Sequence, residues 1–192
     1  MTSREAEAHD LLRARVGADT LGHCERVAET AARIAASYGV DVARARLAGL
    51  LHDWSKEEAA ADLVSSARRH NMPMTDADLE VPYLLHAPVG AVEVCEALPG
   101  IDEAVLHAIA AHTCGAREMS ELDMVVYVAD AIEPGRTHDG VKALRGAVGS
   151  VPLRELFART YTASFRHLIE KRRCVHPVTT DVWNGLVAEV KR

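Results

Sequence analysis

The 192-residue sequence predicts an all-α protein, a single bundle of helices. Apolar residues recur at intervals of three and four along most of the chain, as they do in helices that bury one face. Residues typical of helix starts and stops separate these segments, and no segment of convincing length alternates with the period of a strand. A chain of this length can bury a substantial core as one domain.

The N-terminal third of the chain predicts three helices. The first, residues 5–16, is short and amphipathic, and the second covers residues 20–38. Gly39 ends the second helix, because glycine readily adopts the left-handed conformation that follows a helix. Asp41 can cap the third helix with its carboxylate, and this helix is expected to end near Trp54.

The middle of the chain continues the helical pattern after a turn. Ser55 and Glu58 have the spacing of a capping box for a helix that runs to about Arg69. Residues 71–82 are expected to form a polar connector, and Pro88 opens the next helix, to about residue 98.

Two further apolar segments are bounded by capping and terminating residues. One helix is expected from Asp102 to His112. Ser120 caps the other, and Pro134 and Gly135 terminate it.

The C-terminal part of the chain has weaker helix start and stop signals. Residues 135–150 are glycine-rich and predict a loop or a short turn of helix, whereas residues 153–172 keep the helical interval. Thr180 could cap a last helix. We expect the whole chain, residues 1–192, to form one domain, with its chemistry in a core at about 20–145 and a helical extension at about 150–192.

Charge and cysteine content exclude several classes of protein. The formal net charge of −6 argues against a partner such as duplex nucleic acid. No segment approaches the length of a membrane span, and the N-terminus lacks the apolar segment of a signal peptide. The four cysteines are scattered without a CxxC pair, as in reduced proteins, so we expect a cytoplasmic location.

Histidines and aspartates at the ends of apolar helices are the main functional signal. A lone histidine there is usually a hydrogen-bonded core residue, and a lone buried aspartate is usually a cap or an ion-pair partner. A divalent metal site explains the whole set at once, because the ion supplies the positive charge that a buried carboxylate needs. Six ligands that share a carboxylate suit two ions about 3.5–4 Å apart. The six candidates are His23, His52, Asp53, His86, His112 and Asp130.

Other polar residues are less distinctive. His107 is expected at the surface or behind the ligands, because it lies five positions from His112 on the same helix. Cys24 follows His23, but neighbours on a helix do not face each other, so no Cys–His nucleophile is expected.

The order of these residues resembles the signature of the HD-domain metal-dependent phosphohydrolases. That signature is a histidine, a His-Asp pair and a later aspartate, here His23, His52, Asp53 and Asp130. The additional histidines resemble the six-ligand, dinuclear branch of the superfamily. The segments LLHDWSKE, LLHAPVGA, HTCG and YVADAIEPGR are similar to the YqeK-type family of bacterial symmetrical diadenosine tetraphosphate hydrolases. Cys114 in HTCG stands where that family usually has threonine.

The resemblance implies a helical HD fold with a dinuclear centre. Iron is the favoured metal, in divalent or mixed-valence form, and manganese, cobalt and zinc also fit the ligands. The implied reaction splits diadenosine tetraphosphate into two molecules of ADP by attack of a metal-bridging hydroxide. An HD-type nucleotidase or guanosine tetraphosphate hydrolase remains an alternative, as does a non-catalytic HD domain that senses nucleotide or metal.

Several side chains are candidates for catalysis and for binding phosphate. Asp53 is expected to bridge the metals and orient the nucleophile, and Lys56, three residues later, to neutralise a phosphate oxygen. Arg26 and Arg136 could grip phosphate in a bidentate manner, although Glu133 could instead be the structural partner of Arg136. Thr113 could donate its hydroxyl to phosphate or cap its loop.

The nucleotide base and the oligomeric state are not specified by these motifs. Tyr83, Trp54 and Tyr127 could contact a base, although we expect all three to be core residues instead. The helix at 153–172 could pack on the core or form a homodimer contact.

Overall fold

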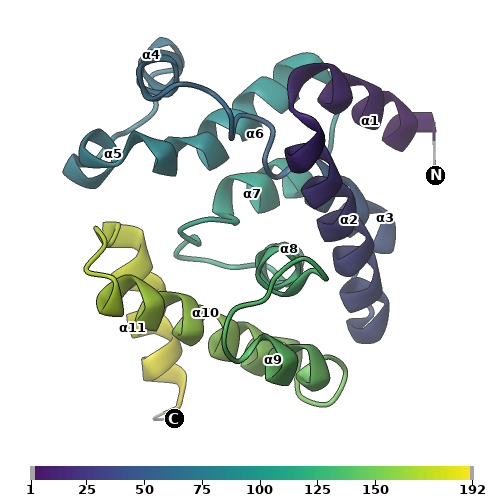
Figure 1. The fold of residues 1–192 in the computed structure, drawn as a ribbon, viewed down its shortest axis with the longest axis vertical. Helices are drawn as coiled ribbons and strands as arrows, with labels where there is room; N and C mark the ends of the chain where they lie inside the picture. The colour runs from purple at the N-terminus through teal and green to yellow at the C-terminus, as the bar shows by residue number, and fades with distance from the viewer. Residues whose placement is uncertain (1–2, 191–192) are drawn as a thin grey trace.

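Every regular element of the computed structural model is helical within residues 3–190, the part of the chain that the structure describes. The all-α prediction is therefore confirmed (Figure 1). In chain order the elements are α1 (Ser3–Arg15), α2 (Ala18–Tyr38), α3 (Val42–Leu51), α4 (Ala60–Arg69), α5 (Asp76–Glu80), the 3-10 helix η1 (Pro82–Leu85), α6 (His86–Ala97), α7 (Glu103–Ala111), α8 (Glu121–Ile132), α9 (Val141–Ala147), α10 (Leu153–Glu170) and α11 (Pro177–Val190).

Helices α2, α3, α7 and α8 form the centre of the bundle. Helix α2 packs along α3 and α8, and α7 packs along α3, α6 and α8. Figure 1 shows α8 nearly end-on in the middle, with α1 to α3 on one side, α4 to α6 above and α9 to α11 below. One buried cluster, rich in alanine, valine and leucine, extends from Ala8 in α1 to Leu186 in α11.

The connection between α2 and α3 follows the predicted signals. Gly39 is left-handed, with a φ of 73°, and its N–H donates to the carbonyl of Ala35. The carboxylate of Asp41 accepts hydrogen bonds from the N–H groups of Ala43 and Arg44, at 2.9 and 3.0 Å. These two caps bring α3 back along α2.

Gly49 lets α3 approach α2 closely. A Cβ atom at this position would lie 3.1 Å from the Cα atom of Ala28 and 3.2 Å from the Cβ atom of Ala31. Gly49→Ala is therefore expected to lower the free energy of unfolding by about 1–3 kcal/mol, because the helices must separate to admit a methyl group. Chemical denaturation of the purified variant would measure the loss.

Gly146 provides the matched control for this substitution. It lies within α9, and a Cβ atom there would meet no atom within 4 Å. Gly146→Ala should raise stability by about 0.5–1 kcal/mol, because alanine restricts the unfolded chain more than glycine does. Equal effects at the two positions would show that helix propensity, rather than the approach of the helices, governs Gly49.

The predicted capping box at Ser55 is wrong. Residues 52–57 form successive turns, and α4 starts only after Ala59, which makes no side-chain cap. The hydroxyl of Ser55 instead donates to Glu93 in α6, at 2.9 Å. A tertiary hydrogen bond has thus replaced the local cap.

Other predicted boundaries also differ. The connector at 71–82 contains α5, capped by a reciprocal pair of hydrogen bonds between Thr75 and Asp78. Helix α6 begins at His86 rather than Pro88, because η1 leads directly into it. Thr180 is no cap, since it lies inside α11 and its hydroxyl donates to the carbonyl of Pro177.

The C-terminal helices contribute an aromatic cluster to the core. The ring of Tyr127 in α8 lies 5.4 Å from that of Phe157 and 5.2 Å from that of Tyr161, both in α10. The glycine-rich segment before α10 contains the short helix α9. Among residues 3–190, no helix combines the length and apolar character that a membrane crossing requires.

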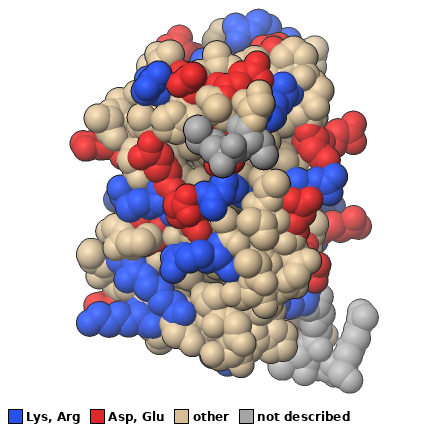
Figure 2. Space-filling view, turned by 90° about the vertical axis from the view of Figure 1, so that its right-hand side faces the viewer, with Lys and Arg blue, Asp and Glu red and all other residues tan. Residues whose placement is uncertain are grey.

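The charged surface has mixed sign. Figure 2 shows acidic and basic side chains interspersed over one face, with basic groups gathered at its lower left. No unbroken basic surface crosses this face, in keeping with the formal net charge of −6.

Candidate metal centre

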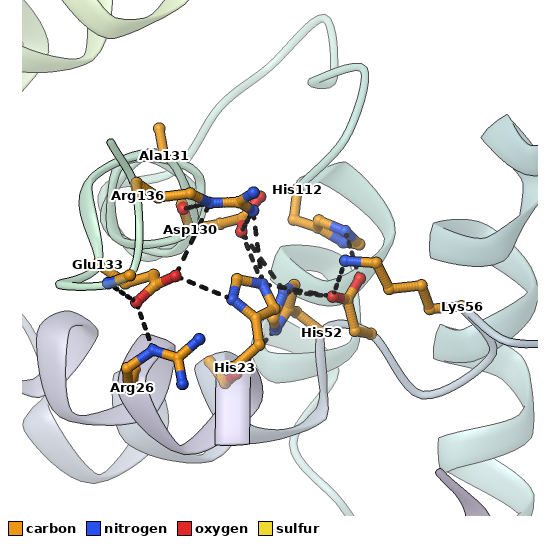
Figure 3. A network of polar contacts seen from close by, with 12 residues as sticks. His23, Arg26, His52, Lys56, His112, Asp130, Ala131, Glu133 and Arg136 are labelled. Carbon is orange, nitrogen blue, oxygen red and sulfur yellow. Dashed lines mark hydrogen bonds and ion pairs between the residues drawn. The ribbon is translucent and has the colours of Figure 1, made fainter. Parts of the chain in front are cut away.

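The six predicted ligands meet in one place, although they come from five helices. His23 lies in α2, and His52 and Asp53 follow the end of α3. His86 is the first residue of α6, His112 caps the C-terminus of α7, and Asp130 lies near the end of α8. Figure 3 shows side chains from α2, α3, α7 and α8 pointing toward one another.

Backbone carbonyls fix the orientation of three imidazoles in the same way. The Nδ1 atoms of His52, His86 and His112 lie 2.8, 2.6 and 2.7 Å from the carbonyl oxygens three residues earlier. Because a carbonyl can only accept, each Nδ1 carries a proton and donates it. The Nε2 atom of each ring is then left with a lone pair that points into the centre.

His23 is oriented by a side chain instead. Its Nδ1 atom lies 3.2 Å from Oε1 of Glu133, a residue that is itself buried. The second carboxylate oxygen of Glu133 accepts from Nε of Arg26 at 2.7 Å and from the N–H of Gly135 at 2.6 Å. Glu133 therefore belongs to the site chiefly as a support for His23 and Arg26, and it lies 3.9 Å from Nε of Arg136.

The ligand atoms form two groups that could each hold a metal ion. One consists of His23, His52 and Asp130, and the other of Asp53, His86 and His112. The Oδ2 atom of Asp53 lies 3.1 Å from Nε2 of His52, whereas its Oδ1 atom lies 3.4 Å from Nε2 of His86 and 3.5 Å from that of His112. The two oxygens of Asp53 thus face different groups.

The facing donor atoms cannot hydrogen-bond to one another, but they could all bind a cation. The Nε2 atoms of His86 and His112 lie 3.1 Å apart, although both rings already carry their proton on Nδ1. Two facing lone pairs repel unless a positive charge lies between them. Nε2 of His52 is also buried without a hydrogen bond. These atoms have the arrangement expected of metal ligands.

The electrostatics keep both aspartates ionised. Burial opposes the charge of Asp53, but His52 and the other imidazoles hold its pKa far below the usual range. Burial likewise opposes the charge of Asp130, and a hydrogen bond with His23 and the charges of His52 and Arg136 hold its pKa far below the usual range. An ionised carboxylate is the form that binds a metal.

The pKa values of two imidazoles move in opposite directions. Burial lowers the pKa of His112. Burial also opposes the charge of His52, yet in the absence of an ion adjacent Asp53 raises its pKa well above the ordinary value, so a metal ion would displace the proton from Nε2 as it binds. The carboxylate is therefore the dominant charge in this part of the centre.

Cationic side chains border the carboxylates. Nζ of Lys56 lies 2.5 Å from Oδ2 of Asp53, because the turn after α3 brings Lys56 back toward the centre. Arg136 donates to both the side chain and the backbone carbonyl of Asp130, at 2.5 and 2.9 Å. Its principal partner is thus Asp130 rather than Glu133.

Arg26 and Thr113 complete the polar border. Arg26 is partly exposed, and Figure 3 shows it on the side of the centre opposite Lys56. The hydroxyl of Thr113 lies 3.2 Å from Nε2 of His86 and 3.0 Å from Nε2 of His112. All of the predicted phosphate-binding residues therefore lie at or beside the centre.

Two further residues, His107 and Cys24, differ in their position relative to the centre. His107 is outside the centre, where it contacts Asp123 at 2.9 Å. Cys24 is buried, and its sulfur lies within 4.8 Å of ligand atoms of His52 and Asp53. The sequence showed only that Cys24 points away from its neighbour His23, not that α3 would approach that side of α2.

Arg15 supports the turn that carries Asp53 and was missed at the sequence level. Its Nε atom donates to the carbonyl of Trp54 at 2.9 Å, and its guanidinium lies 5.1 Å from the centre of the Trp54 ring. The same group forms ion pairs with Glu58 and Glu93. No motif marks Arg15, because its partners are distant in the sequence.

Arg15→Ala is expected to lower the free energy of unfolding by about 1–3 kcal/mol, because it leaves the buried carbonyl of Trp54 without its donor and removes the cation that pairs with Glu58 and Glu93. Arg13→Ala is the matched control, since Arg13 in the same helix is well exposed and forms an ion pair with Asp10, which is exposed too. The control should change stability by no more than about 0.5 kcal/mol. Urea denaturation would compare the two, and equal losses would contradict the role of Arg15.

Comparison with known proteins agrees with this geometry. The family model described as "HD domain" matches residues 20–135, which include all six converging residues. The chain belongs to the HD-domain family. His23 lies near the start of the matched region and Asp130 near its end, and the six converging residues are called the HD centre below.

Curated relatives resemble the chain over most of its length. The symmetrical bis(5'-nucleosyl)-tetraphosphatase of Bacillus subtilis (strain 168) is 34% identical, over 86% of this chain and 88% of the relative. The protein of the same name from Staphylococcus aureus (strain NCTC 8325 / PS 47) is 35% identical, over 84% of each.

A solved structure is similar over nearly the whole chain. It is the crystal structure of a predicted HD superfamily hydrolase involved in NAD metabolism from Clostridium acetobutylicum. Its TM-score is 0.90 at 32% identity, over 96% of this chain and 97% of that chain. The similarity therefore includes the helices on both sides of the HD centre.

Proposed function

We propose that the chain is a metal-dependent symmetrical bis(5'-nucleosyl)-tetraphosphatase, which hydrolyses diadenosine tetraphosphate to two molecules of ADP. The observation that carries the proposal is the convergence of four imidazole Nε2 atoms and two ionised carboxylates in one buried centre. The names of the relatives in Bacillus subtilis and Staphylococcus aureus support the choice of substrate.

In this proposal the six ligands are shared between two ions according to the distances between their ligand atoms. His23, His52 and Asp130 would hold one ion, and His86 and His112 the other. Asp53 would bridge them with its two oxygens. Imidazole and carboxylate ligands suit iron, and manganese, cobalt or zinc would also fit.

The hydrolysis breaks the central anhydride of the tetraphosphate. When bound, divalent ions polarise the phosphate oxygens and lower the pKa of the water that attacks phosphorus. Oxygen from water joins one of the two central phosphorus atoms, the bond from that atom to the bridging oxygen breaks, and one ADP leaves with that oxygen. The water brings two protons, one for the new terminal phosphate oxygen of each ADP, and both are released when these phosphates are fully ionised.

The chain's own residues would hold the tetraphosphate in line. Lys56 would neutralise a non-bridging oxygen from one side of the centre, while Arg136 and Arg26 would bind phosphates on the other side. Thr113 would donate its hydroxyl to a phosphate oxygen close to His86 and His112.

Product analysis tests the proposed activity. Protein purified with iron or manganese is incubated with diadenosine tetraphosphate in oxygen-18 water, and the nucleotides are separated by chromatography and weighed. ADP should be the only nucleotide product, and half of the ADP molecules should carry the label on the terminal phosphate. Protein treated with a chelator provides the control.

Three other outcomes would contradict the proposal. AMP with ATP would indicate asymmetrical cleavage. Turnover of guanosine tetraphosphate or of mononucleotides alone would favour another HD hydrolase. Tight binding of nucleotide without turnover of any of them would favour a sensor.

A further inference from the structure

Tyr83 is an exposed aromatic residue at the edge of the HD centre. Its exposed fraction is 47%, whereas Trp54 and Tyr127 are buried in the core. The expected core position is therefore correct for Trp54 and Tyr127 and wrong for Tyr83. An aromatic ring left open to solvent beside a polar site is available to contact a substrate.

The position of Tyr83 is fixed relative to the ligand His86. The centre of its ring lies 4.5 Å from that of His86, with the two planes inclined by 36°. The carbonyl of Tyr83 also accepts the hydrogen bond from Nδ1 of His86, at 2.6 Å. The short helix η1 thus holds the ring and the ligand as one unit.

Tyr83 lies close enough to the charged residues of the centre to interact with them. The charges of Lys56, Asp53 and Asp130 act on its hydroxyl, whose pKa is raised chiefly by burial. Lys56 is on the side of the centre opposite Arg26 (Figure 3). Tyr83 therefore belongs to the charged border of the centre, beside His86.

We propose that the exposed ring of Tyr83 stacks on a nucleobase of the substrate. This inference rests on the proposed function, in which a ribose and two phosphates separate each base from the bond that is cleaved. Tyr83 lies beside a ligand without being one, as a group that binds this part of the substrate should. Stacking accepts every base, because each has an aromatic face, so Tyr83 would favour nucleotides over inorganic phosphates without selecting adenine.

Measuring the affinity for ADP and for inorganic pyrophosphate distinguishes the contribution of the Tyr83 ring from that of the phosphate-binding residues. Metal-loaded wild type, Tyr83→Phe and Tyr83→Leu are compared by equilibrium dialysis. Tyr83→Leu keeps apolar bulk and the backbone carbonyl that orients His86 but removes the ring. Its Kd for ADP should rise about tenfold, as expected for the loss of one base–aromatic stack, while its Kd for pyrophosphate stays unchanged. Tyr83→Phe should match wild type for both.

Steady-state kinetics provides a second measurement. Tyr83→Leu should raise the KM for diadenosine tetraphosphate with little change in kcat, because the stack is present before and during the reaction. Ile169→Ala, a substitution of an exposed apolar residue in α10, is the matched control and should change neither constant.

The results distinguish this inference from the proposed function. Equal weakening of ADP and pyrophosphate would mean that Tyr83 only positions His86 and would overturn the stack, as would unchanged ADP binding in Tyr83→Leu. Weak ADP binding in Tyr83→Phe would assign the contact to the hydroxyl and would also overturn it. If wild type binds ADP through Tyr83 but does not cleave diadenosine tetraphosphate, the proposed function fails and the stack stands.

Discussion

Asp53→Asn is expected to lose both the bound metal and the hydrolysis of diadenosine tetraphosphate. The carboxylate is 1% exposed and faces four imidazoles and Lys56, so no other side chain can take its place. The amide keeps the size of the group but removes its charge and one acceptor oxygen. Even an outer partner of a ligand typically contributes 10- to 100-fold, so we expect turnover to fall more than about 100-fold. Metal content by atomic emission and product formation would measure both losses.

Asp123→Asn is the matched control for this substitution. Asp123 is also buried, but it caps α8 and contacts His107 away from the HD centre. This variant should be less stable but should bind as much metal per folded molecule as wild type. Wild-type metal content and turnover in Asp53→Asn would refute the bridging role of Asp53.

Metal removal is expected to destabilise the protein strongly. An ion bound only by the folded state adds about 2.7 kcal/mol at a free concentration 100 times its Kd. For a domain of this size the Tm of the metal-bound protein should then be roughly 5–10 °C higher than that of the metal-free protein. The physical cause is the relief of repulsion between the facing Nε2 atoms of His86 and His112.

Thermal unfolding with manganese and with a chelator would measure this shift. Asp53→Asn should show little or none of it, which separates binding at the HD centre from weak binding at the surface. A Tm that is the same with manganese and with chelator in the wild-type protein would contradict a built metal site.

The six converging residues could be predicted from the sequence because each lies at or near the end of an apolar helix. Polar groups in such positions need a partner, and one metal centre supplies a partner to all of them. The relative positions of His86 and His112 could not be predicted in the same way. They depend on how α6 packs along α7, which no local pattern specifies.

Long-range contacts explain most of what sequence reasoning missed. Ser55 has the local spacing of a cap, but the hydrogen bond with Glu93 competes with that role and prevails. Arg15 reaches the turn after α3 through space, and nothing in its own segment marks it. The alternative that Glu133 pairs with Arg136 is met only by a contact of 3.9 Å, whereas Arg26, which no motif linked to Glu133, donates to it at 2.7 Å because α2 approaches the end of α8.

Gly49 connects the packing of two helices with the bite of the proposed metal site. Its Cα lies against α2, the helix that carries His23, and its carbonyl accepts the hydrogen bond that orients His52. The gap between the two helices therefore sets how far apart these imidazoles stand. Gly49 itself would not contact a bound ion. Because it has no side chain, it would nevertheless set the spacing of the two imidazoles and so influence which ionic radius the site prefers.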